Sequence, residues 1–362
     1  MKLLTLRVLT CGLALFFAAD IHSTTLQIRA PDDFHVHLRQ GELLRGVVNE
    51  TASQFKRALV MPNTNPPIRN GNDVSKYRTE ILAAVDPQNA HFQPLMTFKI
   101  TPETTVEDVY SIVGLAVAGK LYPDGVTTNS HGGVTDFHAL YPVFGAMQKL
   151  GIILCLHGEK PGEFCMDREE KFLATLVQLV ADFPDLKMVL EHVSTKAAVE
   201  IVESLPANVG ATITLHHMEL TLDDVVGSMN QPHHFCKPIP KRYEDRDAIL
   251  RAALSGNPKF FFGSDSAPHL RHTKECAEGC AGVFTAPVAL PALVALFEKH
   301  NQLEKLEDFV STFGAQFYGL SLNQEKITLV QEEWTVPKVV AGVVPYQAGR
   351  QLPWKVASPS AQ

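Results

Sequence analysis

Short apolar runs and amphipathic stretches alternate along the chain from Leu26 onward. The apolar runs are predicted strands, at 26–30 continuing toward His37, 57–62, 93–100, 116–122, 151–157, 186–192, 209–216 and 259–265. The stretches between them have helical spacing, as at 73–86, 135–149, 167–182, 194–204, 244–256 and 286–299. Strands that alternate with helices are typical of a parallel sheet, and eight such units predict an α/β fold, a (β/α)₈ TIM barrel.

Residues able to do chemistry stand at the carboxyl ends of most of these predicted strands. They are His35 and His37, Asn63, Lys120, His157, His192, His216 with His217, and Asp265. A closed barrel brings all its strand ends around one mouth, whereas an open sheet spreads them along a crevice. The sequence also has no G-x-G-x-x-G or G-K-[ST] motif. The pattern therefore favours the barrel over an open doubly wound sheet.

The segment DFHVHLR at 33–39 is the first of these strand ends. Because side chains alternate along a strand, His35, His37 and Arg39 should share one face, and Phe34, Val36 and Leu38 the other. Two imidazoles can hold a metal ion, and an arginine can hold an anion. A polar edge strand whose histidines face water explains the heptapeptide equally well.

The two ends of the chain fall outside the repeating pattern. Lys2 and Arg7 precede an apolar run that is too short to span a bilayer. Residues 1–25 are therefore interpreted as a secretory signal, an organelle-targeting segment or an extension without function. Residues 26–330 are predicted to form the barrel, and 331–362 to pack on its exterior. The irregular segment 123–134 is either a plain connection or a mobile flap over the mouth.

Composition narrows the choice of partners. The 362 residues carry a formal net charge of −7, which argues against nucleic acid as the main partner. Six cysteines are irregularly spaced, which favours free thiols in a reducing compartment over a disulfide framework. Cys276 and Cys280 resemble half of a zinc site, but no second Cys or His pair stands at a matching distance.

The ligand candidates at the predicted mouth exceed what one tetrahedral zinc needs. Four histidines and Asp265 suit two metals that share a bridging group. Lys120, at an apolar strand end, should have a lowered pKa, and a neutral amine can react with CO₂ to give a bridging carbamate. From the pattern alone, a lysine that reaches solvent or pairs with an acid is the commoner explanation.

Six motifs in order resemble those of the dihydroorotase family, in the amidohydrolase superfamily: PDDFHVHLR, MPN, GKLYP, LHGE, LEHVSTK and GSDSAPH. The resemblance runs from about Leu26 to about Leu320 and is to the short, barrel-only form without a β-sandwich domain. It implies a zinc-dependent cyclic amide hydrolase that reversibly closes N-carbamoyl-L-aspartate to (S)-dihydroorotate in pyrimidine synthesis.

The resemblance implies a role for each matching residue. The ligands of two zinc ions would be His35, His37 and Asp265 for the first, His157 and His192 for the second, and carboxylated Lys120 between them. Asp265 would also transfer the proton. The substrate contacts would be Arg39, Asn63 and His269 on its carboxylate, backbone groups at Lys237 and Ala281 on its ring, and the mobile-loop threonines Thr127 and Thr128.

Two positions and one segment depart from the family pattern, and none holds a ligand of the two zinc ions. Gln40 stands where an aspartate is usual, Ser264 where a threonine is usual, and TLHHMEL from Thr214 replaces TPQHL. The rival functions are another cyclic amidohydrolase, of the dihydropyrimidinase or hydantoinase type, and a non-catalytic homologue. The former carries a β-sandwich for which the chain has no room upstream, and the latter typically loses ligands. A small-molecule substrate and a homodimer are expected, in the cytoplasm, with an organelle or export as alternatives.

Overall fold

A computed structural model describes residues 24–357 apart from 129 and 131, so nearly all of the predicted extension 1–25 lies outside the described residues. Eight parallel strands form the central sheet, in the same order in space as in the chain. The strands are β2 (Asp32–Val36), β3 (Arg57–Val60), β4 (Gln93–Ile100), β5 (Ala118–Leu121), β6 (Ile153–His157), β7 (Met188–Glu191), β8 (Val209–Ile213) and β9 (Phe260–Phe262). The predicted barrel strands are thus confirmed, with shorter ends.

The sheet closes on itself between β9 and β2. Val36 and Ser266 form a parallel bridge. The backbone N–H of Asp265 donates to His35 O at 2.8 Å, and that of His37 donates to Ser266 O at 3.0 Å. The predicted TIM barrel is therefore confirmed, and its closing seam carries three of the expected metal ligands.

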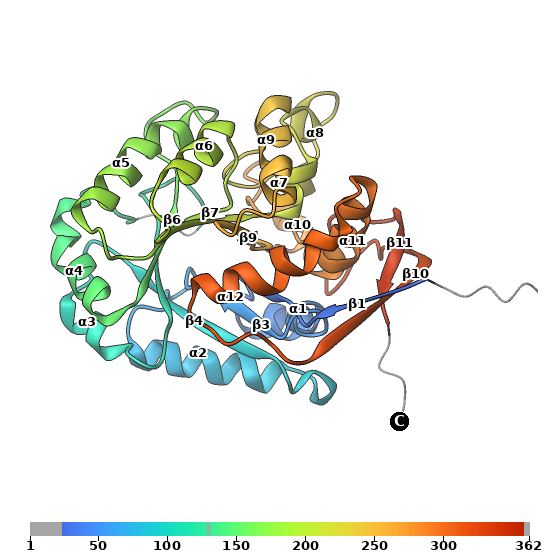
Figure 1. Cartoon of the computed structure of the whole chain (residues 1–362), viewed down its shortest axis with the longest axis horizontal. Helices are drawn as coiled ribbons and strands as arrows, with labels where there is room; N and C mark the ends of the chain where they lie inside the picture. The colour runs from blue at the N-terminus through green and yellow to red at the C-terminus, as the bar shows by residue number, and fades with distance from the viewer. Residues whose placement is uncertain (1–23, 129, 131, 358–362) are drawn as a thin grey trace, which may run out of the picture.

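Helices surround the barrel (Figure 1). They are α1 (Gly41–Ala52), α2 (Gly71–Ala84), α3 (Val106–Ser111), α4 (Tyr141–Leu150), α5 (Arg168–Asp182), α6 (Lys196–Ser204), α7 (Leu215–Glu219), α8 (Asp223–Val226), α9 (Tyr243–Leu254), α10 (Arg271–Lys274), α11 (Ala289–Lys299) and α12 (Phe313–Phe317). Caps fix the loops that leave the strand ends: Thr195, four residues after the end of β7, accepts at Oγ1 from the N–H of Ala198 and caps the start of α6.

The inward face of the barrel is apolar at one end and polar at the other. On β6, Ile153 and Cys155 belong to the inner hydrophobic cluster, and His157 follows them on the same face. Along β3 and the residues directly after it, Leu59 and Met61 belong to the same cluster, and Asn63 follows them at the same spacing. The alternation of side chains along the strands thus fills the barrel interior with apolar groups and places polar side chains at its carboxyl end.

The first strand departs from this simple alternation. The register of β2 against β3 shifts between Asp33 and Val36. Phe34 therefore joins the inner cluster, although His35 next to it also faces the site, while Val36 and Leu38 join the outer core. The expectation that Phe34 would share a face with Val36 and Leu38 is wrong for this reason.

The predicted run from Leu26 to His37 is two strands, not one. β1 (Thr25–Arg29) leaves the barrel and pairs antiparallel with β10 (Lys326–Thr335), which pairs with β11 (Gln351–Val356). The boundary expected at residue 330 consequently falls inside β10. Among the described residues this is the one sheet outside the barrel, and no described helix has the length and apolar character needed to cross a bilayer.

Candidate active site

A pocket opens at the carboxyl end of the barrel strands. Its lining is His37, Arg39, Asn63, Tyr122, Thr127, Thr128, His157, His192, Lys237, Asp265, Ala267, Ala281 and Gly282. Of the residues expected from sequence, only His35, Lys120 and His269 are not in this lining. His35 and Lys120 are buried, and His269 contacts Arg39. The structure therefore gathers all the expected site residues in one place.

His35, His37 and Asp265 form a compact group on the closing seam. Their ligand atoms all lie within 4.8 Å of one another, and all three side chains are buried. His37 Nε2 is 3.0 Å from Asp265 Oδ1, and His35 Nε2 is 3.4 Å from the same oxygen. Two imidazoles and a carboxylate at this spacing are a suitable ligand set for a divalent transition metal.

Each of three histidines is oriented by a partner on its other ring nitrogen. Glu191 Oε2 lies 2.7 Å from His35 Nδ1, and Asn63 Oδ1 lies 2.8 Å from His37 Nδ1. Glu159 Oε2 lies 2.7 Å from His157 Nε2. Such partners fix the tautomer and the ring orientation of metal-binding histidines, and they leave the opposite nitrogen available to a cation.

Three buried polar atoms of this group have no hydrogen-bond partner among the described residues. They are His35 Nε2, Lys120 Nζ and His192 Nδ1. An unsatisfied buried polar group costs about 1–3 kcal/mol. The His192 ring centroid is 4.8 Å from that of His157 and 5.0 Å from that of His35. The His192 ring therefore lies next to two other candidate ligands, and its open nitrogen fits a site for metal ions.

The protonation states suit metal binding as well. Burial lowers the pKa of His37 to about 4, and it lowers the pKa values of His157 and His192, so these imidazoles are neutral at pH 7. Burial also lowers the pKa of Lys120. Burial opposes the charge of Asp265, but the hydrogen bond from His37 and the nearby imidazoles outweigh it and hold its pKa well below the usual value.

Arg39 stands beside the metal ligands on an unusual backbone. It lies past the end of β2 with a φ of 61°, so strand alternation does not place it; the left-handed turn does. Its Nε donates to Pro268 O at 3.0 Å, and its Nη2 donates to His269 Nε2 at 3.0 Å. Burial first, and then the charge of Arg39, lower the pKa of His269 to about 2.

No carboxylate of the described residues makes an ion pair with Arg39. The alternative explanation for Arg39, a structural ion pair, thus finds no support in this part of the chain. Arg39 lines the pocket, and its Nη1 has no acidic partner among the described residues. Its guanidinium is therefore suited to bind the carboxylate of a ligand.

The segment containing Thr127 and Thr128 lies across the pocket. Thr128 Oγ1 donates to Ala281 O at 3.2 Å, and Asn63 Nδ2 donates to Thr128 O at 3.3 Å. Both threonines line the pocket with Lys237 and Ala281. These bonds link the loop to two substrate-contact candidates.

Sequence reasoning assigned no role to Glu159, Glu191 or Tyr122. The two glutamates orient His157 and His35, and the buried Tyr122 hydroxyl has no described partner. The signal was present, since all three fall inside the motifs LHGE, LEHVSTK and GKLYP. A metal-binding histidine commonly donates its other ring N–H to a carboxylate, so a glutamate next to a predicted histidine ligand is a candidate for that role.

The chain is similar to curated proteins over almost its full length. It is 46% identical over 341 residues to a dihydroorotase of Erythrobacter litoralis and 43% identical over 343 residues to one of Nitrosococcus oceani, covering 92% of this chain and 99% of each relative. No protein-family model matches the chain.

Solved structures of dihydroorotases are also similar to the chain over almost its full length. A dihydroorotase from Campylobacter jejuni is 41% identical, with a TM-score of 0.87 over 93% of this chain and 98% of that chain. One from Saccharomyces cerevisiae, in complex with 5-fluoroorotic acid, is 36% identical, with a TM-score of 0.86 over 92% and 98%. An L-hydantoinase from Arthrobacter aurescens is only 15% identical, over 92% of this chain and 83% of that chain, at a TM-score of 0.75, and shows the barrel fold alone.

Proposed function

Because the chain belongs to the dihydroorotase family, we propose that the barrel mouth closes N-carbamoyl-L-aspartate to (S)-dihydroorotate and water, and reverses that reaction. The observation that carries the proposal is the position of Arg39 beside the His35, His37 and Asp265 group. A metal-ligand set and a carboxylate-binding guanidinium are thereby held in one pocket.

Two zinc ions would be held at this mouth. His35, His37 and Asp265 would bind the first, His157 and His192 the second, and Lys120 would bridge them as a carbamate. Bound there, the ions supply a hydroxide at neutral pH and polarise a carbonyl oxygen. The lowered pKa of Lys120 supports the bridge, because its neutral amine forms an N–C bond to CO₂ and releases a proton.

Asp265 is proposed to move the proton. Its carboxylate is ionised, and its Oδ1 lies 3.0 Å from His37 Nε2 at the centre of the group. In the hydrolytic direction it takes a proton from the attacking water and delivers it to the ring nitrogen that leaves. One carboxylate thus serves as general base and then as general acid.

The substrate carboxylate is proposed to bind to Arg39, Asn63 and His269. Arg39 offers a fork of N–H groups, and its hydrogen bonds to Pro268 O and His269 hold that fork in one orientation. Backbone groups at Lys237 and Ala281 would bond the ring, and the Thr127–Thr128 segment would close over it. We also propose a cytoplasmic location, because the substrate is an intracellular metabolite, and the homodimer stays a prediction.

Turnover by the purified protein tests the proposal. Dihydroorotate should be hydrolysed and N-carbamoyl-L-aspartate cyclised, while dihydrouracil, which lacks the carboxylate, should be a poor substrate. Asp265→Asn, which keeps the size of the side chain, should abolish both directions of the reaction. Equal hydrolysis of dihydrouracil and dihydroorotate would favour a hydantoinase-like function instead.

A further inference from the structure

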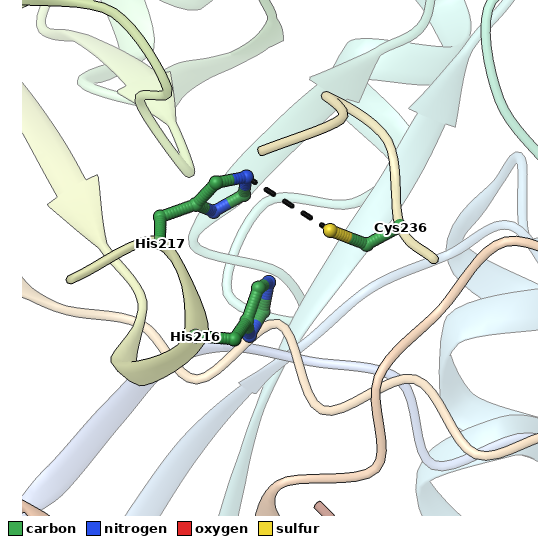
Figure 2. Close-up of side chains that lie close together, drawn as sticks. All are labelled: His216, His217 and Cys236. Atoms are coloured by element: carbon green, nitrogen blue, oxygen red, sulfur yellow. Dashed lines mark hydrogen bonds between the residues drawn. The ribbon is translucent and has the colours of Figure 1, made fainter. Parts of the chain in front are cut away.

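A second cluster of metal-binding residue types lies outside the pocket. His216 and His217 belong to α7, directly after β8, and Cys236 belongs to the irregular segment that follows the short η3 turn (Pro232–His234). None of the three lines the active-site pocket. All three side chains are buried, and Figure 2 shows both imidazoles and the thiol directed toward one another.

The spacing of this cluster is close to that of a ligand set. One ligand atom from each residue lies within 4.8 Å of the other two, and His217 Nε2 is 3.9 Å from Cys236 Sγ. A tetrahedral zinc with bonds of about 2.0–2.1 Å to nitrogen and about 2.3 Å to sulfur holds such atoms roughly 3.3–3.8 Å apart. Small side-chain rotations, closing the widest pair by about 1 Å, would complete the set.

His216 supplies the independent observation that points to a ligand. Its side chain is fully buried, yet neither Nδ1 nor Nε2 has a hydrogen-bond partner among the described residues. The same property marks His35 Nε2 and His192 Nδ1 at the proposed catalytic metals. A buried imidazole with two open nitrogens, beside a second imidazole and a thiol, has a cation as its natural partner.

To bind an ion, His217 and Cys236 would each give up the hydrogen bond that it now donates to Pro238 O. His217 Nε2 lies 2.9 Å from Pro238 O and Nδ1 lies 2.8 Å from Thr214 Oγ1, while Cys236 Sγ donates to Pro238 O at 3.3 Å. If the ring proton of His217 moves to Nδ1, Nδ1–H donates a hydrogen bond to Thr214 Oγ1, and Nε2 becomes available as a ligand. The thiol then loses its proton to solvent, so binding releases one proton overall.

We propose that His216, His217 and Cys236 bind one divalent zinc-like ion, separate from the catalytic metals. The thiolate and the two imidazoles select a borderline-soft cation over Mg²⁺ or Ca²⁺. The ion would join the end of β8 to the segment that carries Lys237, which lines the pocket. It is therefore a structural site that braces one wall of the active site.

Cobalt substitution distinguishes this site from the catalytic one. The catalytic ligands proposed above include no thiolate, so a thiolate-to-Co²⁺ charge-transfer band reports the new site alone. Full-length protein reconstituted with Co²⁺ should show this band and should bind one equivalent of metal per chain beyond the two proposed for the catalytic site. Its absence at saturating Co²⁺ in the unmodified protein would overturn the proposal, with no variant needed.

Variants then locate the site. Cys236→Ser should lose the band and one equivalent of metal, and His216→Gln should weaken binding at the same site by about tenfold or more. Cys276→Ser, which removes an exposed thiol, is the matched control and should keep both. Loss of the band in the control but not in Cys236→Ser would assign it to a surface thiol. The readout is spectroscopic, so the result stands even if the proposed catalytic function fails.

Discussion

Replacing Arg39 by methionine tests the basis of substrate choice. Methionine keeps much of the length of the side chain and removes its charge. In the protein, Arg39 donates from Nε to Pro268 O and from Nη2 to His269. Nη1 has no acidic partner in the described chain, which leaves it for the substrate carboxylate. The variant would leave that carboxylate desolvated and unpaired.

The expected cost follows from this geometry. Removing one partner of a buried, hydrogen-bonded charge pair costs about 2–5 kcal/mol. At roughly 1.4 kcal/mol per decade, kcat/KM for dihydroorotate should fall by about 1.5 to 3.5 decades. Most of the loss should be a raised KM, because the carboxylate is not the reacting group. Arg39→Lys should recover only part, because an ammonium cannot form the two parallel bonds.

Steady-state kinetics in both directions measure these values, and metal content is the control. Arg39 is not a metal ligand, so bound zinc should equal that of the unmodified protein. A kcat/KM within about threefold of the unmodified value would refute the assignment of Arg39 to the substrate carboxylate. A loss of zinc would show that Arg39 acts through the metal ligands.

Three other changes have defined outcomes. Lys120→Ala should lower kcat by at least about 10²-fold, with partial rescue by a short carboxylate at high concentration, and full activity would exclude the bridge. A chain that starts at Ser23 should keep the kcat/KM of the full chain, and a folded but inactive product would show that the first residues matter. Burial raises the pKa of Glu169 to about 7; the folded state then holds a proton that the unfolded state releases above about pH 4.5. The free energy of unfolding should therefore fall by about 3 kcal/mol from pH 4.5 to 7 through this group. Chemical denaturation at several pH values should show that the free energy of unfolding of Glu169→Gln falls less over this range.

The sequence predicts the barrel because its signals are local. Apolar runs with a polar residue at the end mark each strand, and period two carries Cys155 and His157 onto one inward face. The same rule fails at β2, where the register shift brings both Phe34 and His35 inward. A bulge depends on the partner strand and leaves no mark in the local pattern.

The split between β1 and β2 also depends on distant partners. Ala30 donates its N–H to Glu325 O, whereas Pro31 accepts from Lys56 N–H, so the chain changes sheets between these two residues. The link between His216 and Cys236 is equally non-local, because the intervening segment is irregular. The local sequence pattern places His216 and His217 at the end of a strand, but only the folded chain shows the Cys236 thiol beside them.

The pairing of β1 with β10 has a consequence for biosynthesis. Thr25 lies opposite Val330, so the two partners are separated by almost the whole barrel in sequence. At about 5–20 residues per second, a ribosome needs roughly 15–60 s to make the intervening chain. Throughout that interval β1 has an unpaired edge, which is available to chaperones or to other chains. Slower translation lengthens this interval, so it should lower the yield of folded protein through its first strand.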